Sequence, residues 1–308
     1  MPRHPNSPTA RLRRALVAVE RRTLAGPHGE LPVRIYRRRG ARGTSPIGLV
    51  WAHGGGFAYG DLDMPEADRV ARDLAARGIP VVSVGYRLAP PFRNADPSPR
   101  PTSVHFPVAS EEVTAAFWFA ARSGSAPGRG RRRRGVAPRA RGWALGGASA
   151  GADLAAGAAL RLRDEGGPTP RMLLLVYPIV HLELPPASAE LEAAVASLPR
   201  PHRFDADGVR RMNANYLGHP GPADSPYAFP GGHDLAGLPP VRILNAEADT
   251  LRASGEAFGA ELAAAGVDVE MVTEPGTEHG HLNQDVPEAV VSTARLVRWL
   301  REAGRRGS

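Results

Sequence analysis

The sequence of 308 residues contains no cysteine and no lysine. The lack of cysteine excludes disulfides, thiolate zinc sites, iron–sulfur clusters and thiol nucleophiles. All 39 basic side chains are arginines. A Walker loop, a pyridoxal enzyme and a protein kinase each need a lysine, so these three classes are excluded as well.

Long hydrophobic runs are also missing. The longest apolar run, MLLLVYPIV at 172–180, is too short to span a bilayer. The first 22 residues carry several arginines around a brief apolar stretch, which differs from the uninterrupted apolar region of a signal peptide. We therefore expect a cytoplasmic protein with no membrane span.

The net charge of +8 comes almost entirely from one segment. Seven arginines lie between Arg129 and Arg141, in a stretch rich in glycine and interrupted by proline. No aromatic residue is interleaved with them, as would be typical of a nucleic-acid surface. The segment is predicted to be a solvated loop, and no specific nucleic-acid partner is expected.

Short apolar runs alternate with helical stretches along most of the chain. This alternation predicts one α/β domain, with a mostly parallel sheet covered by helices on both faces. A leading hairpin at 22–38 would add antiparallel strands at one edge. The predicted core strands are 48–53, 79–86, 143–149, 171–178, 241–247 and 267–274, and the predicted helices are 64–77, 108–122, 150–164, 253–265 and 287–303.

Two segments stand outside the alternation. One is a helix candidate at 8–22, and the other is the proline-rich stretch 181–230, with a helix near 205–217. In α/β enzymes such insertions commonly lie over the carboxyl ends of the strands, where ligands bind. Within a single domain over 1–308, we expect 1–22 and 181–230 to form a small helical lid.

The stretch GGASAGAD follows an apolar strand and opens an alanine-rich helix. It contains Gly147, Ser149 and Gly151 as G-x-S-x-G. Small residues around the serine permit a sharp, strained turn that lifts the hydroxyl above the sheet. Since glycine and serine are common here, the placement between strand and helix carries more weight than the pattern itself.

The stretch WAHGGGFAYG follows another core strand and is the more specific motif. Its glycines allow backbone N–H groups to point at a developing oxyanion. A plain turn and a dinucleotide loop built on Gly54, Gly56 and Gly60 are the alternatives. A short-chain dehydrogenase would also need a Tyr-x-x-x-Lys pair, which a chain without lysine cannot supply.

These two motifs, together with YRLAP at 86–90, resemble the hormone-sensitive lipase family of α/β-hydrolases. The resemblance runs from about residue 22 to 303. It implies the α/β-hydrolase fold with Ser149, Asp249 and His279 as the triad, in the chain order expected for this fold. The chain departs from the family at Ala148, where members often carry an acid, and at His281, where an aromatic is usual.

The resemblance also implies a reaction. Ser149 would attack a carboxylic ester of short to medium acyl chain, His279 would move the proton and Asp249 would orient the imidazole. The amides of Gly55, Gly56 and Ala150 would surround the oxyanion. The partner is a small-molecule ester, no cofactor or metal is required, and a homodimer is compatible with the sequence.

Several alternatives stay open at this level. Asp249 could be an ordinary helix N-cap, and Glu247 is its close competitor for the acid role. The same machinery would serve an amidase or formamidase, and a non-catalytic receptor of the plant gibberellin type shares the fold. A metal site at the TEHGHLN stretch would need further ligands such as Glu278 or Asp285, and we expect none. His281 is interpreted as a wall or support of the site.

Overall fold

The computed structural model describes residues 15–41, 45–91, 104–124, 138–196, 198–199, 204–219 and 225–305. Their strands form an eight-stranded sheet in the order β1-β2-β4-β3-β5-β6-β7-β8. β1 and β2 are antiparallel, and all the strand pairs from β4 through β8 are parallel, which confirms the predicted sheet. The strands are β1 (Val17–Gly26), β2 (Gly29–Arg38), β3 (Gly48–Ala52), β4 (Val81–Val84), β5 (Trp143–Ala148), β6 (Leu173–Val176), β7 (Val241–Ala248) and β8 (Val269–Glu278).

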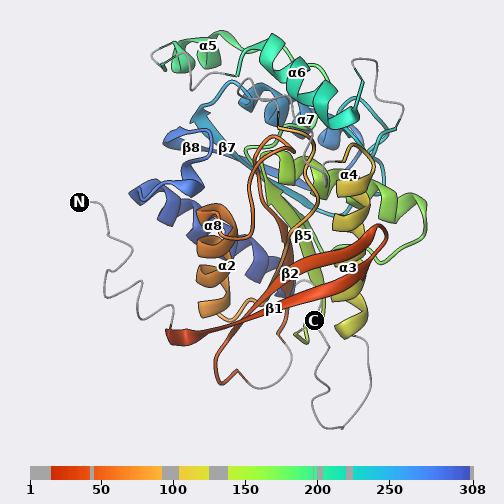
Figure 1. Ribbon diagram of the computed structural model, residues 1–308. Helices are drawn as coiled ribbons and strands as arrows, with labels where there is room; N and C mark the ends of the chain where they lie inside the picture. The colour runs from red at the N-terminus through yellow and green to blue at the C-terminus, as the bar shows by residue number, and fades with distance from the viewer. Residues whose placement is uncertain are drawn as a thin grey trace.

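Helices cover both faces of the sheet (Figure 1). α2 (Pro65–Ala76) and α8 (Pro287–Arg305) contribute to one apolar core. α3 (Val108–Gly124), α4 (Ala150–Asp164) and α7 (Arg252–Ala264) contribute to the core on the other face. The central strands β3, β5 and β6 are buried along their whole length, because apolar side chains project into both cores.

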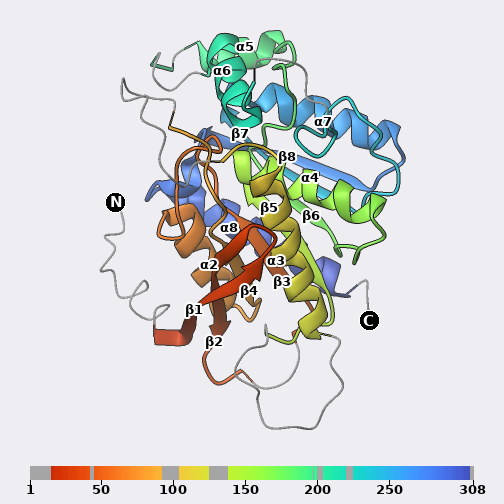
Figure 2. The ribbon, with the colours of Figure 1, turned by 45° about the vertical axis from the view of Figure 1, so that its right-hand side comes forward.

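Two further helices lie together at one end of the molecule, as both ribbon views show (Figures 1 and 2). They are α5 (Ala189–Val195) and α6 (Ala206–Leu217). Each begins after a side chain that accepts a hydrogen bond from a backbone N–H of the first turn, Ser188 at 3.1 Å and Asp205 at 2.6 Å. The second helix confirms the predicted helix near 205–217.

The N-terminal helix prediction is wrong over residues 17–22, whereas residues 15 and 16 are helical. Residues 17–22 belong to strand β1, which pairs along its length with β2 through a tight turn at Pro27 and His28. A neighbouring strand that satisfies every second backbone group favours the extended form over an isolated helical turn. Residues 17–22 are therefore an edge of the sheet, whereas residues 1–14 of the expected lid and 129–137 of the arginine segment lie outside the described residues.

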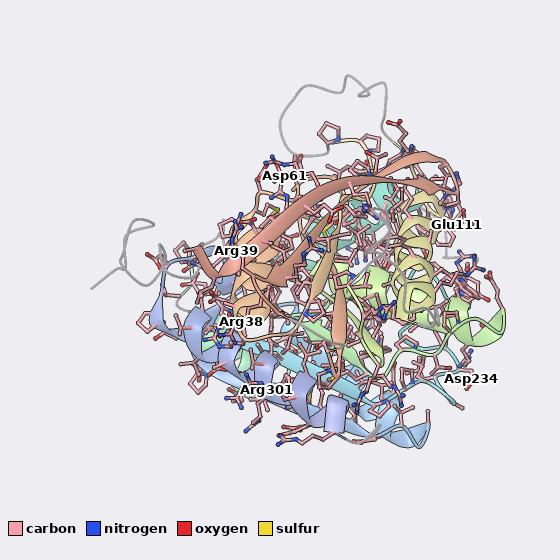
Figure 3. The ribbon with its side chains drawn as sticks, turned by 90° about the horizontal axis from the view of Figure 1, so that it is seen from below. Arg38, Arg39, Asp61, Glu111, Asp234 and Arg301 are labelled. Carbon is pink, nitrogen blue, oxygen red and sulfur yellow. The ribbon has the colours of Figure 1, made fainter. Side chains whose placement is uncertain are left out.

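The outer surface is charged. Viewed from the side opposite α5 and α6, Arg38, Arg39 and Arg301 project from the outside of the layers, as do Glu111 and Asp234 (Figure 3). Within the described ranges, none of the helices combines the length and the apolar character needed to cross a membrane.

Two glycines inside helices provide a paired test of the packing. A Cβ at Gly157 of α4 would lie 2.1 Å from the carbonyl oxygen of Tyr227, whereas one at Gly259 of α7 would meet the flexible sulfur of Met271 at 3.1 Å. We expect Gly157→Ala to lower the free energy of unfolding by about 1–3 kcal/mol through overpacking. Gly259→Ala should change it by less than about 1 kcal/mol, since helix propensity favours alanine. Urea unfolding measures both, and equal effects would contradict the packing argument.

Candidate active site

Ser149 occupies a strained turn between β5 and α4. Its backbone is in a left-handed region, with φ 54° and ψ −123°, which is costly for a residue with a Cβ. A Cβ at Gly147 would lie 2.2 Å from the oxygen of Gly151, and one at Gly151 would lie 2.3 Å from the oxygen of Ala52. Both glycines of the motif are thus required by backbone crowding, which also brings the end of β3 beside the serine.

His279 and Asp249 lie next to Ser149, although both are far from it in sequence. Each follows directly after a parallel strand, β8 and β7, so the shared direction of the strands brings them to one edge. His279 Nε2 is 3.0 Å from Ser149 Oγ, and His279 Nδ1 is 2.6 Å from Asp249 Oδ2. The structure therefore brings together the three residues that the sequence singled out.

The structure does not place Asp249 at the N-cap of α7, because that position is Leu251 and no side chain in the described part of the protein caps the helix. Asp249 lies in the turn before the helix. Its Oδ1 accepts a hydrogen bond from the backbone N–H of Leu251 at 2.9 Å, just before α7. The carboxylate is buried, and the two bonds hold it from both sides. Its competitor Glu247 accepts from the N–H of Gly276 at 2.7 Å instead, and so contacts the end of strand β8 just before His279.

The glycine loop after β3 lies against the serine turn. Gly55 and Gly56 adopt φ values of 118° and 58°, and a Cβ at Gly55 would lie 2.1 Å from the oxygen of Tyr59. These conformations need glycine. In the described part of the chain, the backbone amides of Gly55, Gly56 and Ala150 have no protein acceptor, which leaves them able to bind a ligand oxygen.

His53 supports this loop. Its ring stacks on Tyr86 of the YRLAP stretch with the ring centroids 4.4 Å apart, and the hydroxyl of Tyr86 donates to the carbonyl of His53 at 2.8 Å. His53 Nδ1 lies 2.8 Å from the oxygen of Gly54. Burial lowers the pKa of His53, so its ring is a neutral packing element beneath the loop.

Three residues at the site were not predicted from the sequence. Tyr177 follows β6 with φ 35°, and its ring meets that of His279 edge-on, at 4.8 Å between centroids. Glu66, in the first turn of α2, accepts a 2.7 Å hydrogen bond from the hydroxyl of Tyr177. Phe204, which precedes α6, packs its ring 4.8 Å from that of His279. A tyrosine ending a strand or an acid opening a helix has many ordinary roles, so neither carried a distinguishing signal.

The second histidine of the TEHGHLN stretch points away from the serine. His281 is buried, with Nε2 2.8 Å from Ser292 Oγ and Nδ1 3.3 Å from the carbonyl of Glu278. Burial lowers the pKa of His281 to about 4, so it is neutral at pH 7. The two imidazoles thus face different partners, and among the residues described no cluster of three His, Asp or Glu side chains could hold a metal ion.

Comparisons with known proteins agree with this architecture. The model of a family with the α/β-hydrolase fold matches residues 49–283. The carboxylesterase NlhH of Mycobacterium tuberculosis is 33% identical over 287 residues, covering 89% of this chain and 79% of that protein.

Solved structures show the same likeness. An esterase from Pyrobaculum calidifontis superposes with a TM-score of 0.75 at 30% identity, covering 92% of this chain and 85% of the other. Brefeldin A esterase, a bacterial homologue of human hormone-sensitive lipase, gives a TM-score of 0.75 at 26% identity over 94% of this chain and 78% of its own. The predicted α/β-hydrolase fold and family are confirmed.

The two histidines should differ sharply when replaced. We expect His279→Ala to reduce turnover of p-nitrophenyl butyrate by about 10⁴-fold or more, because the ring bonded to Ser149 would be lost. His281→Ala should cost about tenfold or less, because its ring contacts neighbours of the triad, and EDTA should have no effect. Steady-state kinetics of both variants test which histidine is the catalytic base. An inactive His281→Ala beside an active His279→Ala would show that His281 is the base.

Proposed function

Since this chain belongs to the hormone-sensitive-lipase-like family of α/β-hydrolases, we propose that its reaction runs through Ser149, His279 and Asp249. The protein is an esterase-type serine hydrolase that cleaves carboxylic esters. The observation that carries the residue assignment is the continuous chain of two hydrogen bonds from Ser149 Oγ through the imidazole to the buried carboxylate.

The order of events follows from these contacts. Nδ1–H of His279 donates to Asp249, so Nε2 carries the free electron pair and accepts the proton of Ser149 Oγ. The serine oxygen attacks the ester carbonyl, and the protonated imidazole then delivers that proton to the departing alcohol. A water molecule, deprotonated by the same nitrogen, attacks the acyl-enzyme and releases the carboxylic acid with Ser149 restored.

The negative oxygen that forms during each attack needs donors. We assign this role to the amides of Gly55, Gly56 and Ala150, which flank the serine and have no acceptor within the described chain. Loss of one such donor typically costs about 10²–10³ in turnover. The backbone conformations of Gly55 and Gly56 hold these N–H groups in place before the negative charge develops. Donors that are already oriented stabilise the transition state without a cost of reorganisation.

The segment around α5 and α6 is proposed as the lid of this site. Phe204 packs on His279, and Tyr216 of α6 stacks on Phe57 at 4.0 Å between ring centroids. Phe57 directly follows the proposed oxyanion glycines. An aromatic ring this close to His279 favours compact acyl chains, so we propose esters of short to medium chain as substrates.

We also propose a cellular location and an oligomeric state. We propose that the enzyme acts in the cytoplasm on a small-molecule ester. A homodimer is supported by the exposed side chains of Met271 on the edge strand β8 and of Val290 and Val291 on α8. Sedimentation velocity measures this assembly, and a monomer at micromolar concentration would contradict it.

The nucleophile is tested by Ser149→Ala. Turnover of p-nitrophenyl butyrate should fall by about 10⁴-fold or more, because the covalent step is lost, while the binding groups remain. Circular dichroism and the melting temperature should match those of the parent protein. An aryl phosphonate should label the parent protein covalently and leave the variant unlabelled; retained turnover in the purified variant would refute the mechanism.

The substrate class is tested with a matched panel. Butyrate and acetate p-nitrophenyl esters should be turned over faster than the octanoate ester, because Phe204 beside His279 would limit the space for a long acyl chain. N-formyl and anilide substrates should react far more slowly than esters. A higher kcat/KM for an amide would instead make the enzyme an amidase that uses the same triad.

A further inference from the structure

Glu66 is a charged side chain in the interior beside the proposed active site. It is only 2% exposed, although it lies in the first turn of α2. Its Oε1 accepts from the N–H of Gly54 at 2.6 Å, and its Oε2 accepts from the hydroxyl of Tyr177 at 2.7 Å and from the amide of Asn283 at 2.9 Å. Three donors from three separate segments thus converge on one carboxylate.

Each donor belongs to a different part of the reaction machinery. Gly54 precedes the oxyanion glycines, and a Cβ built on it would lie 3.1 Å from the Cβ of Ser149. Asn283 lies in the short 3-10 helix just after His279, and its side-chain oxygen also accepts from the backbone N–H of Glu66 at 3.1 Å. Tyr177 presents its ring edge-on to that of His279.

We propose that Glu66 is a positioning residue that ties the oxyanion loop to the loop of the catalytic base, through Gly54 on one side and Tyr177 and Asn283 on the other. The proposal rests on the function proposed above for Ser149 and His279. Glu66 acts through its neighbours, since its oxygens are occupied by Gly54, Tyr177 and Asn283.

Chemistry favours a carboxylate at this position. An ionised carboxylate only accepts hydrogen bonds, which suits a point where three donors meet. Burial raises the pKa of Glu66, while the bonds from Tyr177, Gly54 and Asn283 and the nearby His279 oppose that shift. A glutamine of the same shape would turn an N–H toward one of these donors and leave it unsatisfied in the interior.

Small displacements at this point matter for rate. The oxyanion donors must face the carbonyl oxygen while the base holds the serine hydroxyl that attacks the same carbonyl group, and a misplacement of about 1 Å can cost about 10²-fold. Glu66 is a single group bonded to both loops, so its loss would allow them to shift independently. Glu66 is buried and bonded to the two loops, so its loss should change their alignment more than substrate binding, and kcat should fall more than KM rises.

The test compares two tyrosine variants that lose the same kind of bond. Tyr177→Phe removes the donor to Glu66, and Tyr36→Phe removes a 2.8 Å bond from a buried tyrosine to Asp68, on the same helix α2 but away from the site. We expect Glu66→Gln to lower kcat by about 30-fold and Tyr177→Phe by about threefold to tenfold, with KM within threefold. Tyr36→Phe should lower the melting temperature without changing kcat.

A double-mutant cycle tests the contact between Glu66 and Asn283 directly. Asn283→Asp alone places two carboxylates in contact and should be as damaging as Glu66→Gln. Combined with Glu66→Gln, it restores an amide–carboxylate pair with the roles exchanged. We expect the double variant to be at least fivefold more active than the product of the single effects predicts.

The outcomes separate this inference from the proposed function. Three results would each overturn the positioning role of Glu66. The first is a double variant whose kcat loss is the product of the two single losses, and the second is a kcat of Glu66→Gln within threefold of the parent. The third is a kcat loss in Tyr36→Phe as large as that in Tyr177→Phe. If Glu66→Gln does not fold, an unchanged kcat in Tyr177→Phe overturns it. None of these results affects the Ser149→Ala test, whereas activity in Ser149→Ala would remove the premise itself.

Discussion

The site depends first on close backbone contact between two loops that emerge from neighbouring parallel strands. The turn at Ser149 and the glycine loop after β3 approach so closely that Gly147 and Gly151 have no room for a Cβ. This contact brings the serine hydroxyl beside the amides of the glycine loop. A side chain at Gly151 would clash with the carbonyl oxygens of Ala52 and His53, and one at Gly147 would clash with those of Gly151 and Ala52.

The strain in these loops is held by buried polar contacts. Ser149 and Tyr177, both with positive φ, follow adjacent strands of the sheet. Such conformations persist only where the surroundings determine them strongly. The stack of His53 on Tyr86 supports the glycine loop from below, and Glu66 joins it to the segment after His279. The apolar cores fix the strands, while these polar contacts fix the loops.

The two histidines His279 and His281, which are separated by one residue, have different surroundings. His279 has both ring nitrogens engaged by Ser149 and Asp249, at the edge where the strands end. His281 is enclosed with Ser292, and burial keeps its ring neutral at pH 7. An intervening glycine with φ 74° turns the chain between them, which sends the two rings in different directions.

The sequence by itself determined the alternation of strands and helices and the glycine spacing around Ser149, because periodicity and glycine spacing are local properties. Asp249 and His279 were expected at the site only through the family resemblance. It misjudged residues 17–22, whose strand exists through pairing with β2. Only the tertiary structure decided that Glu66, Tyr177 and Phe204 belong to the site. Their positions at the site result from contacts between segments that are distant in the chain. An acidic residue in the first turn of a helix is usually exposed to solvent, and no local pattern shows that Glu66 is buried among three hydrogen-bond donors.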